Sequence, residues 1–221
     1  MELYGKKITL IQMKKILFIL SVLMIAIAPV SAQSNKDTRM AKKEAKKAVK
    51  EAYKEGYKML EVGDLEMRIA DHLEKVYAGT AFQIVNTAEG KRSVNMAKTQ
   101  ARNNVLNEHA ESARSLVKGR VTSDMHDIGY IQAENFVAAY ERLVCAELNG
   151  EVRVSYTLVR HNKKDNTYDV KLVCLVDYEA AHQAHLKAIQ RAAKEQEIAQ
   201  QYGSKISEWI NEGFVDSVVN Y

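Results

Sequence analysis

The chain has 221 residues, of which 47% are hydrophobic and 27% are charged, and its formal net charge at pH 7 is +4. This hydrophobic fraction excludes global disorder. Two cysteines are too few for a disulfide-dense scaffold or a four-thiolate zinc site. A chain of this length can bury one sizeable core, so we expect a globular protein.

The first 32 residues have the pattern of a secretory signal peptide. Two lysines precede an apolar run over residues 16–30, and a small-residue motif ends at Ala32. We predict cleavage between Ala32 and Gln33, and therefore a periplasmic or secreted protein. The alternative is a retained membrane anchor, but this run is shorter than the roughly 20 apolar residues that a spanning helix needs.

Signal cleavage changes what the charge implies. Residues 1–32 hold four lysines and one glutamate, so the mature chain has 28 basic and 27 acidic residues and a net charge of +1. A nucleic-acid partner is therefore not expected. Gln33 stands where a bacterial lipoprotein has its lipidation cysteine, and no second long apolar run follows, so no membrane span is expected after cleavage. Translation starts either at Met1 or at Met13.

Residues 33–76 are predicted to form a helical N-terminal extension. Alanines recur at three- and four-residue intervals through residues 36–60, which is helical spacing. Gly63 and Asp64 then indicate a stop followed by the N-cap of a second helix, which would run to Val76.

Residues 77–177 are predicted to form an α+β core domain. A strand is expected over 81–85, a long alanine-striped helix over 91–117 that Gly119 closes, a short strand over 120–124, and a helix over 131–148, with a strand over 142–148 as the alternative for its last part. The clearest pattern is a β-hairpin, because apolar residues alternate with polar ones over 152–158 and again over 168–176. The expected fold is a small antiparallel sheet with this hairpin, packed against long helices.

Residues 178–221 are predicted to form a helical C-terminal extension. One helix would run over 178–201, Gly203 would interrupt it, and a short amphipathic helix would follow. The alanine stripes of both extensions suit packing against other helices.

Small and polar residues across the core domain carry a family likeness. They are Gly79-Thr-Ala81, Ala97, Ala101, Asn103, Asn104, Leu106, Val117–Ser123 and Thr167–Val173. With these residues, the segment 76–177 resembles a small bacterial envelope family typified by a twenty-kilodalton surface lipoprotein (Lpp-twenty-like). The resemblance implies an envelope-located, non-enzymatic α+β protein. This chain lacks the family's lipidation cysteine, so outer-membrane anchoring is not carried over.

The sequence indicates no catalytic or metal site. Glu179, His182 and His185 share a helix face, but the spacing is not that of a zinc protease, and we interpret the histidines as surface residues. Asp169 and Asp177 lie on the strand face opposite to the apolar one and are expected to be solvated. No serine nucleophile motif or phosphate-binding glycine loop occurs, and no cofactor is expected.

Cys145 and Cys174 leave two alternatives. In an oxidising compartment they could form a disulfide that closes a loop of about 30 residues and contributes roughly 3–4 kcal/mol. Two separate buried thiols are favoured, because Cys174 lies on the apolar face of its strand.

The leading hypothesis is a non-catalytic envelope protein that acts by binding an envelope protein partner or by forming a homo-oligomer. A periplasmic hydrolase of glycan or peptide and a small-ligand binding module are the alternatives.

Overall fold

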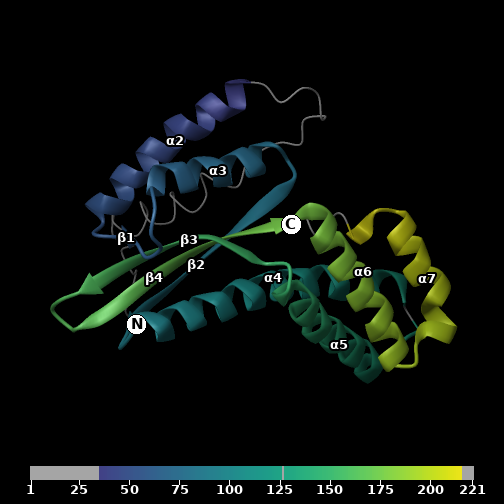
Figure 1. Cartoon of the computed structure of the whole chain (residues 1–221). Coiled ribbons are helices and arrows are strands. Elements are labelled where there is room, and N and C mark those ends of the chain that lie inside the picture. Colours follow the sequence, from purple (N-terminus) through teal and green to yellow (C-terminus); the bar gives the residue numbers. More distant parts are fainter. Residues whose placement is uncertain (1–34, 126, 216–221) are drawn as a thin grey trace, which may run out of the picture. The chain divides into compact units, whose positions relative to one another are not determined.

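The computed structural model describes residues 35–125 and 127–215 (Figure 1). The predicted signal peptide and its cleavage site between Ala32 and Gln33 lie outside these residues. Within the described part the fold is α+β, as predicted from the sequence. In chain order the elements are α2 (Asn35–Lys54), β1 (Lys58–Met59), α3 (Leu65–Tyr77), β2 (Ala81–Lys91), α4 (Val94–Asp124), α5 (Tyr130–Asn149), β3 (Arg153–Asn162), β4 (Thr167–Asp177), α6 (Tyr178–Glu195) and α7 (Ala199–Asn211).

The described strands form one antiparallel sheet in the order β1-β3-β4-β2. The predicted hairpin is confirmed as β3 and β4, with Asn166 in the left-handed conformation at the turn. A bulge between Val154 and Tyr156 shifts the register of β3, and a second one between Ala88 and Lys91 shifts that of β2. β2 is longer than the expected strand over 81–85, because the polar residues after it still pair with β4.

Different helices cover the two faces of the sheet (Figure 1). On one face, α4 packs against the apolar side chains of β4, which are Val170, Leu172, Cys174 and Val176. On the other face, Tyr156 and Leu158 of β3 pack with Tyr57 and Ile69, which belong to the α2–α3 part. The sheet is therefore buried on both sides along its centre, which the alternating sequence pattern alone does not require.

The predicted extensions pack onto this core. α2 lies on α3 through Ala45 and Ala52, which are buried in one cluster with Leu65 and Ile69. Asp64 caps α3 as predicted, since its carboxylate accepts from the Met67 N–H at 2.9 Å. Asp177 is an exposed N-cap of α6, which agrees with its expected contact with water.

Two helix boundaries differ from the sequence-based expectation. Residues 120–124 are the last turns of α4 and not a strand, because Val117 and Val121 continue the buried stripe beyond Gly119. An exposed glycine inside a helix costs only about 1 kcal/mol, which this packing outweighs. The break before α7 lies at Glu197, whose φ is +57°, and α7 runs through Gly203.

Candidate functional site

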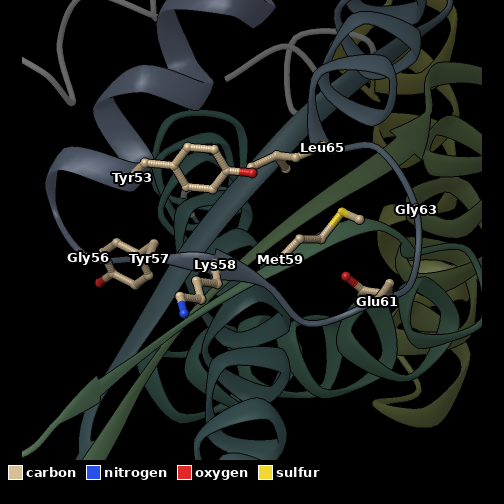
Figure 2. A pocket seen from close by; sticks show the side chains of 8 residues that line it. All are labelled: Tyr53, Gly56, Tyr57, Lys58, Met59, Glu61, Gly63 and Leu65. Carbon is tan, nitrogen blue, oxygen red and sulfur yellow. The ribbon is translucent and has the colours of Figure 1, made fainter.

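A pocket opens where α2 ends, β1 forms and α3 begins (Figure 2). Its volume is about 460 Å³, within the range of about 300–1,000 Å³ that is typical of ligand sites. We call it the β1 pocket, and its lining residues are Tyr53, Gly56, Tyr57, Lys58, Met59, Glu61, Gly63 and Leu65. Aromatic and apolar side chains stand there beside one cation and one carboxylate, so the pocket suits an apolar group with a polar neighbour.

The segment that forms the β1 pocket also exposes large hydrophobic side chains to water. They are Tyr53, Leu60, Val62 and Met67. Val62 is 97% exposed and Tyr53 is 56% exposed. Single exposed hydrophobic residues are common, but several in one short segment beside a pocket mark an interaction site.

Backbone contacts anchor this segment to the edge of the sheet. The Leu60 N–H donates to the Thr157 carbonyl oxygen at 2.9 Å, and the Thr157 N–H donates to Oε2 of Glu61 at 2.9 Å. Gly63 has a φ of +138°, a conformation that side chains disfavour, and it turns the chain into α3. Val62 is therefore presented to solvent from a loop whose two sides are fixed.

Tyr57 joins the β1 pocket to a charged cluster on the hairpin. The guanidinium carbon of Arg160 lies 4.8 Å from the centre of the Tyr57 ring, and Nζ of Lys171 lies 5.4 Å from it. Burial raises the pKa of the Tyr57 hydroxyl, although Arg160 acts in the opposite direction. Tyr57 is therefore a neutral ring held by cation–π contacts with two basic side chains.

The carboxylate of Asp169 supplies the negative charge of this cluster. The expectation that Asp169 is solvated is wrong. It is 2% exposed, and its Oδ2 accepts from Arg160 at 2.7 and 3.0 Å. Its Oδ1 accepts from the Gly90 N–H at 2.8 Å and from Asn162 at 2.9 Å. Burial acts to raise the pKa of the carboxyl, but the hydrogen bonds from Asn162, Gly90 and Arg160 outweigh it and lower the pKa.

A buried histidine on α3 links two strands of the sheet. Nε2 of His72 lies 2.9 Å from Oε1 of Gln83, and its Nδ1 lies 2.9 Å from Oγ of Ser155. Because an amide oxygen only accepts, Nε2 carries the hydrogen and Nδ1 accepts from the serine hydroxyl. Burial lowers the pKa of His72, so the ring is neutral at pH 7. Ser155 stands at the β3 bulge, a type of position that re-aims a side chain.

The second buried histidine is His185, so its interpretation as a surface residue is wrong. His185 is 1% exposed, its Nδ1 lies 2.7 Å from the Tyr140 hydroxyl, and its Nε2 lies 2.9 Å from Nε2 of His109. Burial lowers the pKa of His109 to about 4 and that of His185 to about 3. Repulsion from His109 and His182 adds to the shift at His185. These contacts join α4, α5 and α6.

The two cysteines are free thiols in the structure, so the disulfide alternative is not formed there. Cys174 is fully buried on β4, and burial raises the pKa of its thiol to about 11. Cys145 on α5 is half-buried, and its Sγ lies 3.9 Å from Oδ1 of Asn107. Of the two thiols, only Cys174 is fully buried, and the choice between a disulfide and two separate thiols in solution stays a prediction.

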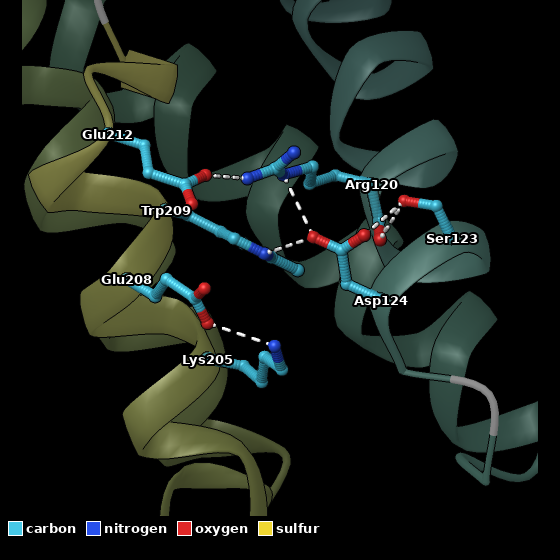
Figure 3. Close-up of polar contacts among 7 residues, drawn as sticks. All are labelled: Arg120, Ser123, Asp124, Lys205, Glu208, Trp209 and Glu212. Carbon is cyan, nitrogen blue, oxygen red and sulfur yellow. Dashed lines mark hydrogen bonds and ion pairs between the residues drawn. The ribbon is translucent and has the colours of Figure 1, made fainter.

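A polar network fastens α7 to the end of α4 (Figure 3). Nε1 of Trp209, which is fully buried, donates to Oδ2 of Asp124 at 2.8 Å. Arg120 forms ion pairs with Asp124 and with Glu212. The hydrogen bond from Ser123 contributes most to the lowered pKa of Asp124. The network is thus a structural joint between α4 and α7.

Two of these features were missed in the sequence analysis although the sequence holds a signal for each. The β1 pocket was missed, although the glycines at 56 and 63 bracket it and Val62 stands between them as an apolar residue in a turn. His185 could have been found, because it continues the alanine stripe of α6 at Ala181 and Ala188. Glu179, His182 and His185 form no metal site, and within residues 35–125 and 127–215 no group of three potential ligands is close enough to hold an ion.

Comparison of the chain with protein-family models, with curated proteins and with solved structures gives no match. The resemblance to the small bacterial envelope family therefore stays a prediction that depends on the residues of the segment 76–177. In the part of the chain that the structure describes, no helix combines the length and the apolar character that crossing a membrane requires.

Proposed function

We propose that this protein is exported through its signal peptide and acts as a non-catalytic cell-envelope protein. It would act in the periplasm or after secretion, as the resemblance to the envelope family also implies. The sequence of residues 1–32 supports the export. The mode of action would be binding, to an envelope protein partner or to a second copy of the chain.

The exposed segment around the β1 pocket is the observation that carries this proposal. Val62 stands in water on a loop that is fixed on both sides, and the pocket beside it is lined by Met59 and Leu65. A partner that covers Val62 and inserts an apolar side chain into the pocket would remove apolar surface from water, which stabilises a complex by about 25 cal/mol per Å². Lys58 and Glu61 would supply polar contacts at the edge of such an interface.

The test compares the proteins that co-purify with the wild type and with two matched variants. In Val62→Lys the charge falls on the proposed surface. In Ile131→Lys it falls on α5, another exposed aliphatic position that belongs to a different part of the fold. We expect one envelope protein to be captured by the wild type and by Ile131→Lys, and to be lost with Val62→Lys. Equal capture by all three would contradict the proposed surface.

A hydrolase is the second candidate, and the contact between Ser155 and His72 is the observation that favours it. A neutral histidine that accepts from a serine hydroxyl, and that a third side chain orients, is the arrangement of a serine nucleophile and its base. Gln83 takes the place of the usual carboxylate, so it orients the ring without stabilising a positive charge. None of these three residues lines the β1 pocket.

A fluorophosphonate probe decides between the two candidates. A serine hydrolase would be labelled at Ser155, and His72→Gln would abolish the label while Ser207→Ala would leave it unchanged. We expect no labelling of Ser155 at probe concentrations that label a reference hydrolase. That result would leave the hydrogen bonds of His72 as a link between α3 and the sheet.

A further inference from the structure

β2 is the last strand of the sheet, and its outer edge meets no other strand of the described residues. It pairs with β4 on one side only, in contrast to β4, which has a neighbour on both sides (Figure 1). The strand at the opposite end of the sheet, β1, is only two residues long. Along β2, alternate residues direct their N–H and C=O groups outwards, which makes the edge a template for another strand.

Burial shows that water reaches this edge. Within β2 only Ala81 and Ala88 are buried, whereas most residues of β4 are. Val85, in the middle of the strand, is 42% exposed. The residues of β2 are therefore more accessible to water than those of the central strand β4.

The first eight residues of β2 lack the features that keep most sheet edges apart. Residues 81–88 contain no charged residue, proline or glycine, and they include Phe82, Ile84 and Val85. Natural edge strands are commonly protected by lysine, by proline or by a bulge. Here the charges begin at Glu89, where the register shifts, and the Gly90 N–H is taken up by Asp169. The edge that could pair with another strand is thus uncharged over residues 81–88 and ends at the bulge after Ala88.

We propose that two copies of this chain associate through their β2 strands, which pair antiparallel about a two-fold axis and make one sheet continuous across the dimer. A pairing centred on Val85 sets Phe82 opposite Ala88, Gln83 opposite Thr87 and Ile84 opposite Asn86. Residues of equal parity share a face, so the α4 sides of both copies lie on the same side of the joined sheet.

A second copy fits this edge because the strand can meet itself without opposing like charges. In the pairing centred on Val85, every residue from 82 to 88 faces an uncharged residue. A charged foreign strand would gain no ion pair there. This proposal concerns the end of the sheet away from β1, so it does not depend on the surface proposed around Val62.

The test measures the mass of the purified protein by sedimentation equilibrium, with two variants that differ only in where the lysine stands. We expect the wild type and Val62→Lys to have twice the chain mass. We expect Val85→Lys to be monomeric with an unchanged circular dichroism spectrum, because two lysines would face each other at the two-fold axis. Val85→Ile keeps the apolar side chain and should remain dimeric.

A cysteine variant tests the register of the proposed pairing between the two β2 strands. In a chain with Cys145→Ser and Cys174→Ser, Val85→Cys places one thiol opposite its copy, and mild oxidation should link most of the protein as a disulfide dimer. A monomeric wild type, a natively folded dimer of Val85→Lys, or a dimer that Val85→Cys does not cross-link would each overturn the proposal. So would a wild type that stays monomeric and pairs its β2 edge only with another protein. Loss of partner capture by Val62→Lys with the dimer intact would separate the two proposals.

Discussion

Arg160 and Asp169 face each other across the β3–β4 hairpin as a cross-strand pair, with Nη2 of the guanidinium 2.7 Å from Oδ2 of the carboxylate. The guanidinium of this pair also lies 4.8 Å from the centre of the Tyr57 ring, which lines the β1 pocket. Because the carboxylate is buried and the guanidinium is partly exposed, the two partners are not equivalent. Loss of the anion leaves a cation without its neutralising group beside an aromatic ring.

Replacement of Asp169 by asparagine should destabilise the protein and loosen the pocket. The variant removes the charge while keeping the size. Its amide oxygen can still accept from Asn162 and from the Gly90 N–H, but an NH2 group replaces the oxygen that accepts from Arg160, so the guanidinium loses both its acceptor and its neutralising charge. Removing one member of a buried pair costs about 3–5 kcal/mol, and the partial exposure of Arg160 favours the lower end. Urea unfolding at pH 7 measures this. A loss below about 1 kcal/mol would contradict the assigned role of Asp169.

The buried histidines should make stability depend on pH in a predictable direction. Burial lowers the pKa of His109 to about 4 and that of His185 to about 3, whereas both have a pKa near 6.5 when unfolded. Below pH 6.5 the unfolded chain therefore binds more protons, and the free energy of unfolding falls as pH is lowered from about 6.5 towards 4. The slope is at most about 1.4 kcal/mol per pH unit for each histidine.

A variant pair isolates this effect. His109→Gln should reduce the slope between pH 6.5 and 4, because one titrating group is gone. Gln190→Ala, at an exposed position of α6 that carries no titrating group, should leave the slope unchanged. Identical pH profiles of the free energy of unfolding for His109→Gln and the wild type would show that burial of His109 does not control stability at low pH.

The two thiols should differ in reactivity. Cys174 is fully buried with a pKa near 11, so it should not react with a thiol reagent in the native protein at pH 8. Cys145 is half-buried and should react slowly. Two thiols should be counted after denaturation without reductant, and one in Cys145→Ser. A count of zero in the denatured wild type would mean that a disulfide forms in solution.

Asp124 should matter more for stability than its place near the surface suggests. Asp124→Ala leaves the buried N–H of Trp209 without an acceptor, which costs about 1–3 kcal/mol. Lys205→Ala removes an exposed ion pair with Glu208 in the same region, and its cost should stay below about 1 kcal/mol. Thermal unfolding of both variants decides this, and equal midpoints would contradict the role of the Asp124–Trp209 hydrogen bond.

Local structure was predictable from the sequence where local rules determine it. The alternation of β3 and β4 follows from a strand period of two, and the cap at Asp64 follows from the acceptor that a helix start needs. The α+β class follows from these elements together. The extent of α4 beyond Gly119 was mispredicted, because tertiary packing of Val121 outweighs the weak helix propensity of one glycine.

The polar interior was not predictable in the same way. Asp169 lies on the face of β4 that alternation assigns to water, and it is buried because the α2–α3 part covers that face as well. His185, Tyr140 and His109 come from three different helices, and their contacts depend on how those helices pack. The β1 pocket likewise needs the end of α2 to meet the edge of the sheet, which no spacing in the chain specifies.

We propose that the segment around the β1 pocket binds a partner in the envelope. Photo-crosslinking in intact cells tests this proposal, with a photoreactive phenylalanine analogue at position 62 and, as the control, at position 131. We expect one discrete adduct to an envelope protein from position 62 that is absent from position 131. Adducts that are equal at both positions, or no adduct from position 62 in correctly exported protein, would contradict it.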